Sequence, residues 1–469
     1  MPTPKPNDLL RRARLRLDST RSPGEKISRQ ELADLVALWI FQEKGGRVTP
    51  IDDHYIGKLE RGVVRWPQED YRSALRAIFG ARTDSELGFY RSRQTDSTQS
   101  ASLIEHEELE FPTSWQNGIE STTQLWRQDM ERRHLLAGAV FGIGSHSSLA
   151  LRWLTKRTEV ISAQGSRQVG TWEIDTIREM TTAFRRFDNR FGGGRGRSTL
   201  LCFLNDEVAP LLRDGKYSGN VAKDLFSAVA EITHLAGWMA YDEERHGLAQ
   251  RYLFQALHFA SSSDDEGFGG EILAGMGHQA LYLGRPMDAI DLALAAQQSA
   301  KRSKIFSLLA ESYTLEAHSH AVRGDRRACF SAMALAEQAF DRANPENEPE
   351  WIRYFDSAYM SAKFAHCLRD LGAAKEAEPY ALRSLDMKQN YVRGRSFNMA
   401  LLASIYGSCG EVDQACAMGT ETIQIMQTLN SRRCHHYIRD VRRSLSQYRS
   451  MPVVREFEQA STQAFSAVS

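Results

Sequence analysis

The sequence predicts an all-α fold with two main parts, a small N-terminal helical domain and a C-terminal array of helical pairs. Apolar residues recur at helical spacing between residues 28 and 80, and small residues recur every forty positions after residue 231. A length of 469 residues also exceeds what one hydrophobic core usually organises. We therefore expect four regions: a helical domain with a basic arm over 1–90, a linker over 91–116, a helical intermediate region over 117–230, and repeats with a C-terminal capping helix over 231–469.

The composition is typical of a folded protein that works in water. Hydrophobic residues make up 42% and charged residues 25% of the chain, which argues against both membrane spans and global disorder. No apolar run follows Met1 and no stretch of about twenty apolar residues occurs, so we expect a cytoplasmic protein without a membrane partner. The six cysteines form no CxxC pair and are expected to be small buried side chains, with no metal or other cofactor.

Charge is distributed unevenly along the chain. The formal net charge is zero, yet the first thirty residues carry eight lysines or arginines against three acids. This local excess favours an attraction to phosphates that is confined to the N-terminal end. A mobile, solvated tail is the alternative interpretation.

The first predicted helix begins at a capping box. Ser28 and Glu31 are spaced so that each side chain can satisfy the other's free backbone N–H. The helix is expected to end at Gly45 and Gly46. Its predicted apolar face consists of Leu32, Leu35, Val36, Trp39 and Ile40.

Two further helices are expected before residue 80. An aspartate, Asp52 or Asp53, can cap the second, which carries Ile56 and Leu59 inward and stops at Gly62. Pro67 opens the third. The inward residues of the third helix are predicted to be Tyr71, Leu75 and Ile78.

These segments resemble the helix-turn-helix of the phage-repressor (Cro-type, or XRE) family. The resemblance covers residues 28–33 and 54–62 together with Pro67, and its most specific part is the Ile-x-x-Leu-Glu-x-Gly core of residues 56–62. In that family the second helix of the motif lies in the major groove of double-stranded DNA. Carried over by position, the resemblance implies base-facing Asp53, His54 and Lys58, a phosphate contact for Gln30, and backbone contacts for Arg61 or Arg65.

The chemistry of these residues agrees in outline with the resemblance. His54, Lys58 and Arg61 fall on other helix faces than the core residues and carry donors suited to guanine edges or phosphates. Asp53 can accept from a cytosine amino group, but a helix cap is the interpretation we favour for it. The connection over 34–50 is longer than the family's tight turn, so the angle between the helices stays open, and a helical bundle without nucleic acid is the alternative.

Two segments between the domains carry few structural signals. The Ser-, Thr-, Gln- and Glu-rich stretch over 91–116 cannot bury enough apolar surface to order itself and is predicted to be a linker. Residues 191–198 read Phe-Gly-Gly-Gly-Arg-Gly-Arg-Ser, without the Gly-Lys-Ser/Thr ending of a phosphate loop. We predict a connection between helices there, with an anion site as the minor alternative.

The repeats are visible as small residues at fixed spacing. Gly237, Gly277 and Ala317 recur at forty residues, and two further units follow after an insertion over 344–349. The units resemble tetratricopeptide repeats, whose paired helices have a small residue midway along the first helix and a glycine turn. The period is longer than that family's, but the resemblance implies a solenoid with a concave face. A second small residue recurs in step at Ala249, Ala289 and Cys329.

The repeat also serves as a ruler for the concave face. The residue after each mid-helix small residue should face the concavity, and so should the residue seven positions earlier, two helical turns away. We expect this groove to bind a peptide, a small molecule or a partner protein; a solvated polar face produced by repeat duplication is the alternative, and a metal site is not favoured because the rungs lie far apart. The predicted groove residues are Glu231, Trp238, Tyr241, Glu271, His278, Glu311, His318 and His366.

The sequence therefore favours a regulator over an enzyme. It contains no HExxH, Gly-x-Ser-x-Gly or dinucleotide motif, and no catalytic residue is assigned. The arrangement resembles actinobacterial repressor-type regulators with repeats, which often govern development or secondary metabolism. We expect a sequence-specific transcriptional regulator that acts as a homodimer, as operator symmetry suggests. An interaction scaffold that uses its repeats and does not bind DNA is the alternative.

Overall fold

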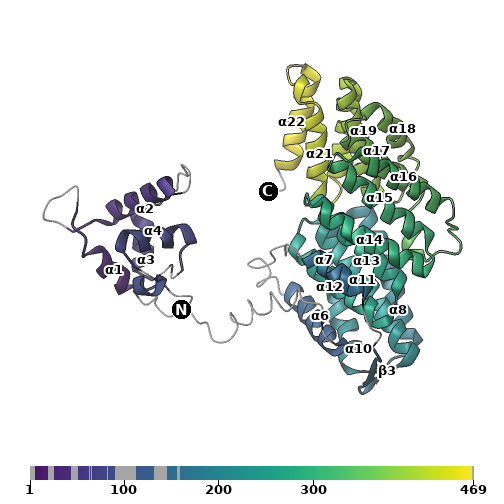
Figure 1. Ribbon diagram of the computed structural model, residues 1–469, viewed down its shortest axis with the longest axis horizontal. Helices are drawn as coiled ribbons and strands as arrows, with labels where there is room; N and C mark the ends of the chain where they lie inside the picture. Colours follow the sequence, from purple (N-terminus) through teal and green to yellow (C-terminus); the bar gives the residue numbers. More distant parts are fainter. Residues whose placement is uncertain are drawn as a thin grey trace. The chain divides into compact units, whose positions relative to one another are not determined.

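The computed structural model describes residues 6–19, 26–43, 51–62, 64, 66–81, 83–89, 112, 114–130, 145–155 and 159–466 (Figure 1). The described chain is predominantly helical, which confirms the predicted helical class. It divides into two compact units, within residues 1–103 and 104–469, and each is described by itself. Arg65, the Gly45–Gly46 stop and almost all of the predicted linker lie outside the described residues. None of the helices in the described ranges is both long and apolar enough to cross a membrane.

The N-terminal unit forms where the capping signals predict. Ser28 N donates to Glu31 Oε2 at 2.9 Å and Glu31 N donates to Ser28 Oγ at 3.1 Å, which confirms the capping box. Leu32, Val36 and Ile40 form the centre of the predicted apolar face and are fully buried. Leu35 and Trp39 lie at its edges, so Leu35 is 36% exposed and Trp39 is half-buried. The elements are α1 (Asp8–Arg14), α2 (Arg29–Glu43), α3 (Asp53–Glu60), α4 (Glu69–Phe79) and a 3-10 turn (Asp84–Leu87).

The cap of α3 is Asp52 rather than Asp53. Asp52 Oδ1 accepts from Tyr55 N at 2.7 Å, so the capping role that we favoured for Asp53 is wrong. Asp53 is instead the first residue of the helix, and its side chain is exposed. Ile56 and Leu59 are fully buried against α2, as predicted.

The large unit contains the remaining elements, mostly helices. Its first part consists of α6 (Trp115–Met130), α7 (Ser145–Leu154), β1 (Ser162–Gln164), β2 (Arg167–Gln168), α8 (Thr171–Phe191), α9 (Gly193–Phe203), a π-helical turn (Leu204–Val208), α10 (Ala209–Asp214) and β3 (Gly215–Ser218). The helical pairs follow as α11 (Gly219–Asp242), α12 (His246–Ser263), α13 (Glu266–Tyr282), α14 (Pro286–Ser303), α15 (Phe306–Val322), α16 (Arg326–Phe340), α17 (Ser357–Asp370), α18 (Ala374–Arg383), α19 (Val392–Cys409) and α20 (Val412–Met426). A 3-10 turn (Glu350–Ile352) precedes α17, and α21 (Arg433–Ser444), a 3-10 turn (Ser446–Tyr448) and α22 (Pro452–Ser466) complete the unit.

A small sheet of order β1-β3-β2 was not predicted. Ala163 pairs with Tyr217 in the antiparallel β1–β3 ladder, and Gln168 pairs with Lys216 in the parallel β2–β3 ladder. Strands of two to four residues are too short to show an alternating pattern in the sequence.

Cys202 also differs from prediction: it is exposed, whereas four of the other cysteines are buried.

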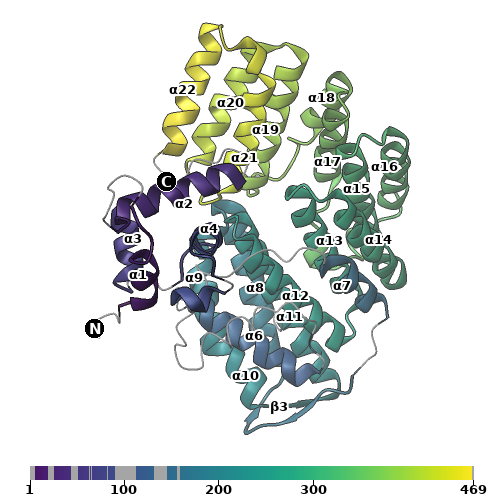
Figure 2. The same ribbon diagram turned by 60° about the vertical axis from the view of Figure 1, so that its left-hand side comes forward.

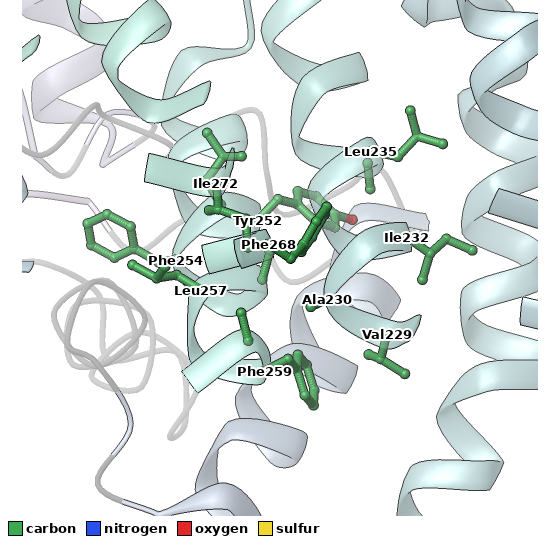
Figure 3. Close-up of a cluster of buried hydrophobic side chains, with 14 of the residues drawn as sticks. Val229, Ala230, Ile232, Leu235, Tyr252, Phe254, Leu257, Phe259, Phe268 and Ile272 are labelled. Carbon is green, nitrogen blue, oxygen red and sulfur yellow. The ribbon is translucent and has the colours of Figure 1, made fainter. Parts of the chain in front are cut away.

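The helical pairs pack closely at the predicted small residues, and successive pairs follow one another along the unit (Figure 2). A Cβ at Gly237 would lie 3.0 Å from Tyr252 Cβ, and one at Gly277 would lie 2.4 Å from Leu315 Cδ2. One hydrophobic core runs from α6 to α15, and Figure 3 shows the part of it where α11, α12 and α13 meet. The predicted border between residues 230 and 231 falls inside α11, so the intermediate region and the first repeats share this core.

The end of the array returns to its beginning. Asn430 N donates to the Phe191 carbonyl at 2.8 Å, Gly194 N donates to the Asn430 carbonyl at 3.0 Å, and α19 packs on α8. Behind these bonds lies a buried ion network that joins α8, α11, α19 and α21. We call the two together the terminal junction; its residues are Asp188, Gly192, Gly193, Gly194, Asp242, Arg393, Asn430, Ser431 and Arg433.

Candidate functional site

The first candidate site is the outer face of α3. Asp53, His54 and Arg61 are exposed and Lys58 is half-buried, while the opposite side of the helix is buried. Arg61 lies along the helix, since a Cβ at Gly57 would be 2.9 Å from its Nη1. The surface thus presents one carboxylate, one imidazole and two cations within three helical turns.

Gln30 lies on α2, at the start of the preceding helix. Its side chain is exposed, and its Nε2 donates to Asp34 Oδ1 at 2.9 Å. The contact is one turn along the same helix, so Gln30 is held at the surface without being buried.

Glu60 holds the basic N-terminal segment against α3. Its side chain is 3% exposed, and its two oxygens accept from Arg14 Nε at 2.7 Å and from Arg29 Nε at 2.8 Å. Burial alone would raise the pKa of Glu60, but the hydrogen bonds and charges of both arginines outweigh burial and lower the pKa. Two of the N-terminal cations are therefore paired with Glu60 and do not add to the exposed positive charge. The exposed cations of α1 and its C-terminal flank are Arg11, Arg12 and Arg16.

Acid is expected to loosen the N-terminal unit through Glu60. Its folded pKa lies below the ordinary value of 4.5, so the ion pairs stabilise the unit above that value and are lost as the pH falls through the folded pKa. Glu60→Gln should cost about 2 kcal/mol at pH 7, a modest value because the Arg29 side chain is 41% exposed and keeps part of its hydration, and should flatten the acid dependence. Hydrogen exchange of α3 amides in the full chain measures both effects, with Asp8→Asn as the control; equal acid sensitivity in the two variants would contradict the assignment.

The second candidate site is the inner side of the helical pairs, where the forty-residue repeat spacing predicted the groove residues. Glu271 on α13 and Glu311 on α15 come together, and His278 Nε2 lies 3.2 Å from Glu311 Oε1. Glu231 on α11 stays apart from them and faces Arg185 at 3.7 Å. Trp238 contacts Tyr241 edge-on, with ring centroids 5.3 Å apart.

Three of the predicted groove residues are more buried than a groove lining would be. Glu271 is 6%, Glu311 1% and Tyr241 3% exposed. The cause for the two glutamates is Tyr354, whose hydroxyl lies 2.9 Å from Glu271 Oε1 and 2.8 Å from Glu311 Oε2. Tyr354 follows the insertion that delays the fourth repeat, so the insertion places a side chain over the predicted face. These residues form a buried polar cluster rather than an open row.

Tyr354 lies between the two glutamates. Its hydroxyl has one hydrogen, so it can donate fully to only one of the two carboxyl groups at a time. Burial, followed by the negative charge of Glu311, raises the pKa of Glu271 well above its ordinary value. Burial also raises the pKa of Glu231. The neighbouring imidazole stays neutral, because burial lowers the pKa of His278 to about 4.

The two remaining histidines form a second polar group. His318 Nε2 lies 2.9 Å from Asp370 Oδ2, and the His318 ring stacks on His366 with centroids 5.3 Å apart. Burial alone would raise the pKa of Asp370, but the hydrogen bond from His318 and the Arg369 charge lower it. The forty-residue spacing therefore placed His318 and His366 on helix faces that lie side by side, while their assignment to a binding groove stays a prediction.

Sequence reasoning missed the residues that complete the inner side. Tyr359 and Lys363 lie on α17, with Lys363 Nζ 4.9 Å from the Tyr359 ring centre. Arg433 on α21 is nine-tenths buried, and its guanidinium carbon lies 4.4 Å from the Tyr241 ring centre and 5.1 Å from that of Phe397. The predicted capping helix therefore contributes a cation, Arg433, to the inner side. The only signal for this contribution in the sequence was the Arg-rich composition of the segment after the last repeat.

No protein-family model matches the sequence, and no curated protein matches it. Within the described parts of the chain, no group of three or more His, Cys, Asp or Glu side chains could hold a metal ion.

Proposed function

We propose that this protein is a sequence-specific DNA-binding transcription regulator whose helical repeats sense a ligand. In this proposal α2 and α3 are the two helices of a Cro-type helix-turn-helix, and the pairs from α11 onward are a tetratricopeptide-like solenoid. The observation that carries the proposal is α3 itself: a short helix, capped by Asp52, with one side buried and donors on the other. A helix in this setting is the element that such motifs place in the major groove.

The charge pattern supports DNA over a protein partner for this face. His54, Lys58 and Arg61 supply hydrogen-bond donors on α3, and exposed arginines continue along α1 in the same unit. Phosphate contacts give affinity and base contacts give specificity, so a surface that binds an operator needs both kinds of donor. Operators of this class have two half-sites, so the proposal includes a homodimer.

The test is a gel shift with a genomic pull-down, comparing wild type with the His54→Ala, Lys58→Ala double variant over a salt series. We expect selective binding in the wild type and a loss of roughly tenfold to a hundredfold per lost base contact. The salt slope should fall by about one if Lys58 contacts a phosphate.

The matched control for this test removes two exposed lysines of the large unit, Lys216→Ala with Lys375→Ala, and should bind as the wild type does. Circular dichroism verifies that the α3 double variant is folded. Identical binding by the two double variants, or no selective binding at low salt, would contradict the DNA-binding assignment. The second outcome favours the alternative of a repeat-based interaction scaffold.

A further inference from the structure

We propose that Cys329, Met333 and Cys367 form a binding site for one copper(I) ion, called the sulfur cluster below. Cys329 and Met333 lie on α16 and Cys367 lies on α17, and all three belong to the same hydrophobic core cluster. None of them is among the residues assigned to DNA or to the groove, so the inference goes beyond the proposed function. It also gives two of the cysteines a role that the sequence did not indicate.

The three sulfur atoms meet around Cys329. Cys329 Sγ donates to Met333 Sδ at 3.8 Å, one helical turn away, and the Cys329 thiol is hydrogen-bonded to the thiol of Cys367. A metal–sulfur bond is about 2.3 Å long, so two sulfur ligands of one ion lie about 3.8 Å apart at a tetrahedral angle and about 4.6 Å apart when linear. The sulfur atoms therefore need little movement to hold an ion, and the flexible side chain of Met333 supplies that movement.

Repeat duplication does not account for the sulfur cluster. In the repeat register, the counterparts of its three residues one unit earlier are Ala289, Ala293 and Ser319. Side chains without sulfur therefore satisfy the packing of the repeat at all three positions. The meeting of two thiols and a thioether is particular to the α16–α17 contact.

The ligand set selects a soft, monovalent metal. Thiolate and thioether sulfur atoms together are typical of copper(I) sites. A structural zinc ion takes four ligands, and the described side chains contain no group of three His, Cys, Asp or Glu that could supply them. Copper(I) is satisfied by two or three sulfur ligands, which is the number present here.

The two thiols are prepared unequally for a metal ion. The hydrogen bond with Cys367 lowers the pKa of the Cys329 thiol although burial opposes this change; the Arg326 charge adds to the lowering. The charges of Asp325 and Asp370 act in the opposite direction. Burial, followed by the same hydrogen bond, raises the pKa of Cys367 well above its ordinary value. When copper(I) binds, both sulfur atoms form bonds to the metal, their two protons pass to water, and no electron is transferred.

A cavity beside the sulfur cluster gives an ion a route to it. The cavity has a volume of about 350 Å³ and lies among α16, α17 and α18. Met333 lines it together with the exposed side chains of Phe330 and Glu337, so it opens to solvent. Met333 is 7% exposed, whereas both cysteines are fully buried. The thioether is therefore the first ligand that an incoming ion meets.

Copper competition with the full chain tests the proposal. The protein is reduced, freed of reductant and titrated under nitrogen with the coloured copper(I) complex of bicinchoninate, with ascorbate present to keep the copper reduced. We expect one copper ion to pass to each chain. X-ray absorption at the copper edge of the loaded wild type should show sulfur neighbours alone, which tests the ligands without any substitution.

Variants locate the site. Cys329→Ala and Cys367→Ala should each lower the copper affinity about 100-fold or more, because losing even an outer-shell partner of a metal costs about 10–100-fold. Met333→Leu keeps the side-chain volume and should lower the affinity about tenfold. Cys202→Ala is the matched control, because Cys202 is the exposed cysteine, and this variant should bind copper as the wild type does. Circular dichroism verifies that each variant is folded.

Several results would overturn the proposal. They are an absence of copper transfer, nitrogen or oxygen neighbours in the absorption spectrum, and copper binding that is lost in Cys202→Ala but kept in Cys329→Ala and Cys367→Ala. Unchanged affinity in Met333→Leu would reject the three-sulfur site. The sulfur cluster shares no residue with α3, so the outcome is independent of the gel shift: copper binding does not depend on DNA binding, and its failure leaves the regulator proposal in place.

Discussion

Arg393→Met is expected to detach the last helical pairs from α8 and to cost the large unit about 3–5 kcal/mol, the usual effect of removing one partner from a buried ion network. Arg393 Nη1 and Nη2 donate to the two Asp188 oxygens at 2.9 and 2.7 Å, and Nη1 lies 3.2 Å from Asp242 Oδ2. Both aspartates are buried. Methionine fills similar space but leaves the two carboxylates facing each other with Arg433 as the remaining cation.

The loss should be localised and should depend on pH. In an array each pair contacts mainly its neighbours, so α8 and α19–α21 should lose hydrogen-exchange protection while α13–α16 keep theirs. Burial raises the pKa of Asp188 even with Arg393 present, and removing Arg393 raises it further. A carboxyl group with a raised folded pKa destabilises the fold as the pH rises, so the cost should be larger at pH 8 than at pH 5.

One further variant at this position separates charge from geometry, and one on α21 serves as a control. Arg393→Lys keeps the charge but loses the two-pronged contact, and should fall between wild type and Arg393→Met. Arg439→Met removes an exposed arginine of α21 and should change stability by less than about 0.5 kcal/mol. Protection lost equally throughout the unit in Arg393→Met would show that the junction is not a separate closing contact.

Local signals explain what the sequence predicted well. The capping box at Ser28, the buried pair of Ile56 and Leu59, and the small residues at Gly237 and Gly277 each act within one or two helices. The forty-residue spacing places Glu271 and Glu311 at one repeat position and His278 and His318 at another, seven residues later. This is why Glu271, Glu311 and His278 were predicted for the same face. Asp53 shows the limit, since two adjacent aspartates offer the same cap and only the backbone decides between them.

The missed features depend on contacts between distant parts of the chain. Tyr354 follows an insertion that interrupts the forty-residue spacing. The spacing therefore could not predict which face of the helical pairs Tyr354 contacts. Arg393 and Asp188 are 205 residues apart, and nothing in either local sequence indicates the other. The segment over 191–198 was predicted to be a connection between helices, but only Gly192 lies between α8 and α9, and residues 193–198 form the first turns of α9. The glycines at 192–194 are needed because an added Cβ would lie close to Asn430 or to the Met239 carbonyl across the junction.

Gly192→Ala is the second change for which we expect a large loss of stability, about 3 kcal/mol. Gly192 has φ +87°, and an added Cβ would lie 2.6 Å from the Asn430 carbonyl oxygen, a backbone atom that cannot move without breaking the Asn430 N to Phe191 bond. Gly219→Ala is the matched control, because Gly219 has φ +58° with nothing within 4 Å of the added Cβ, and should show the backbone strain alone, about 1 kcal/mol. Urea unfolding of the full chain, followed by hydrogen exchange of α8 and α19, measures the difference; equal losses in the two variants would mean that the close approach at Asn430 contributes nothing to holding the array closed.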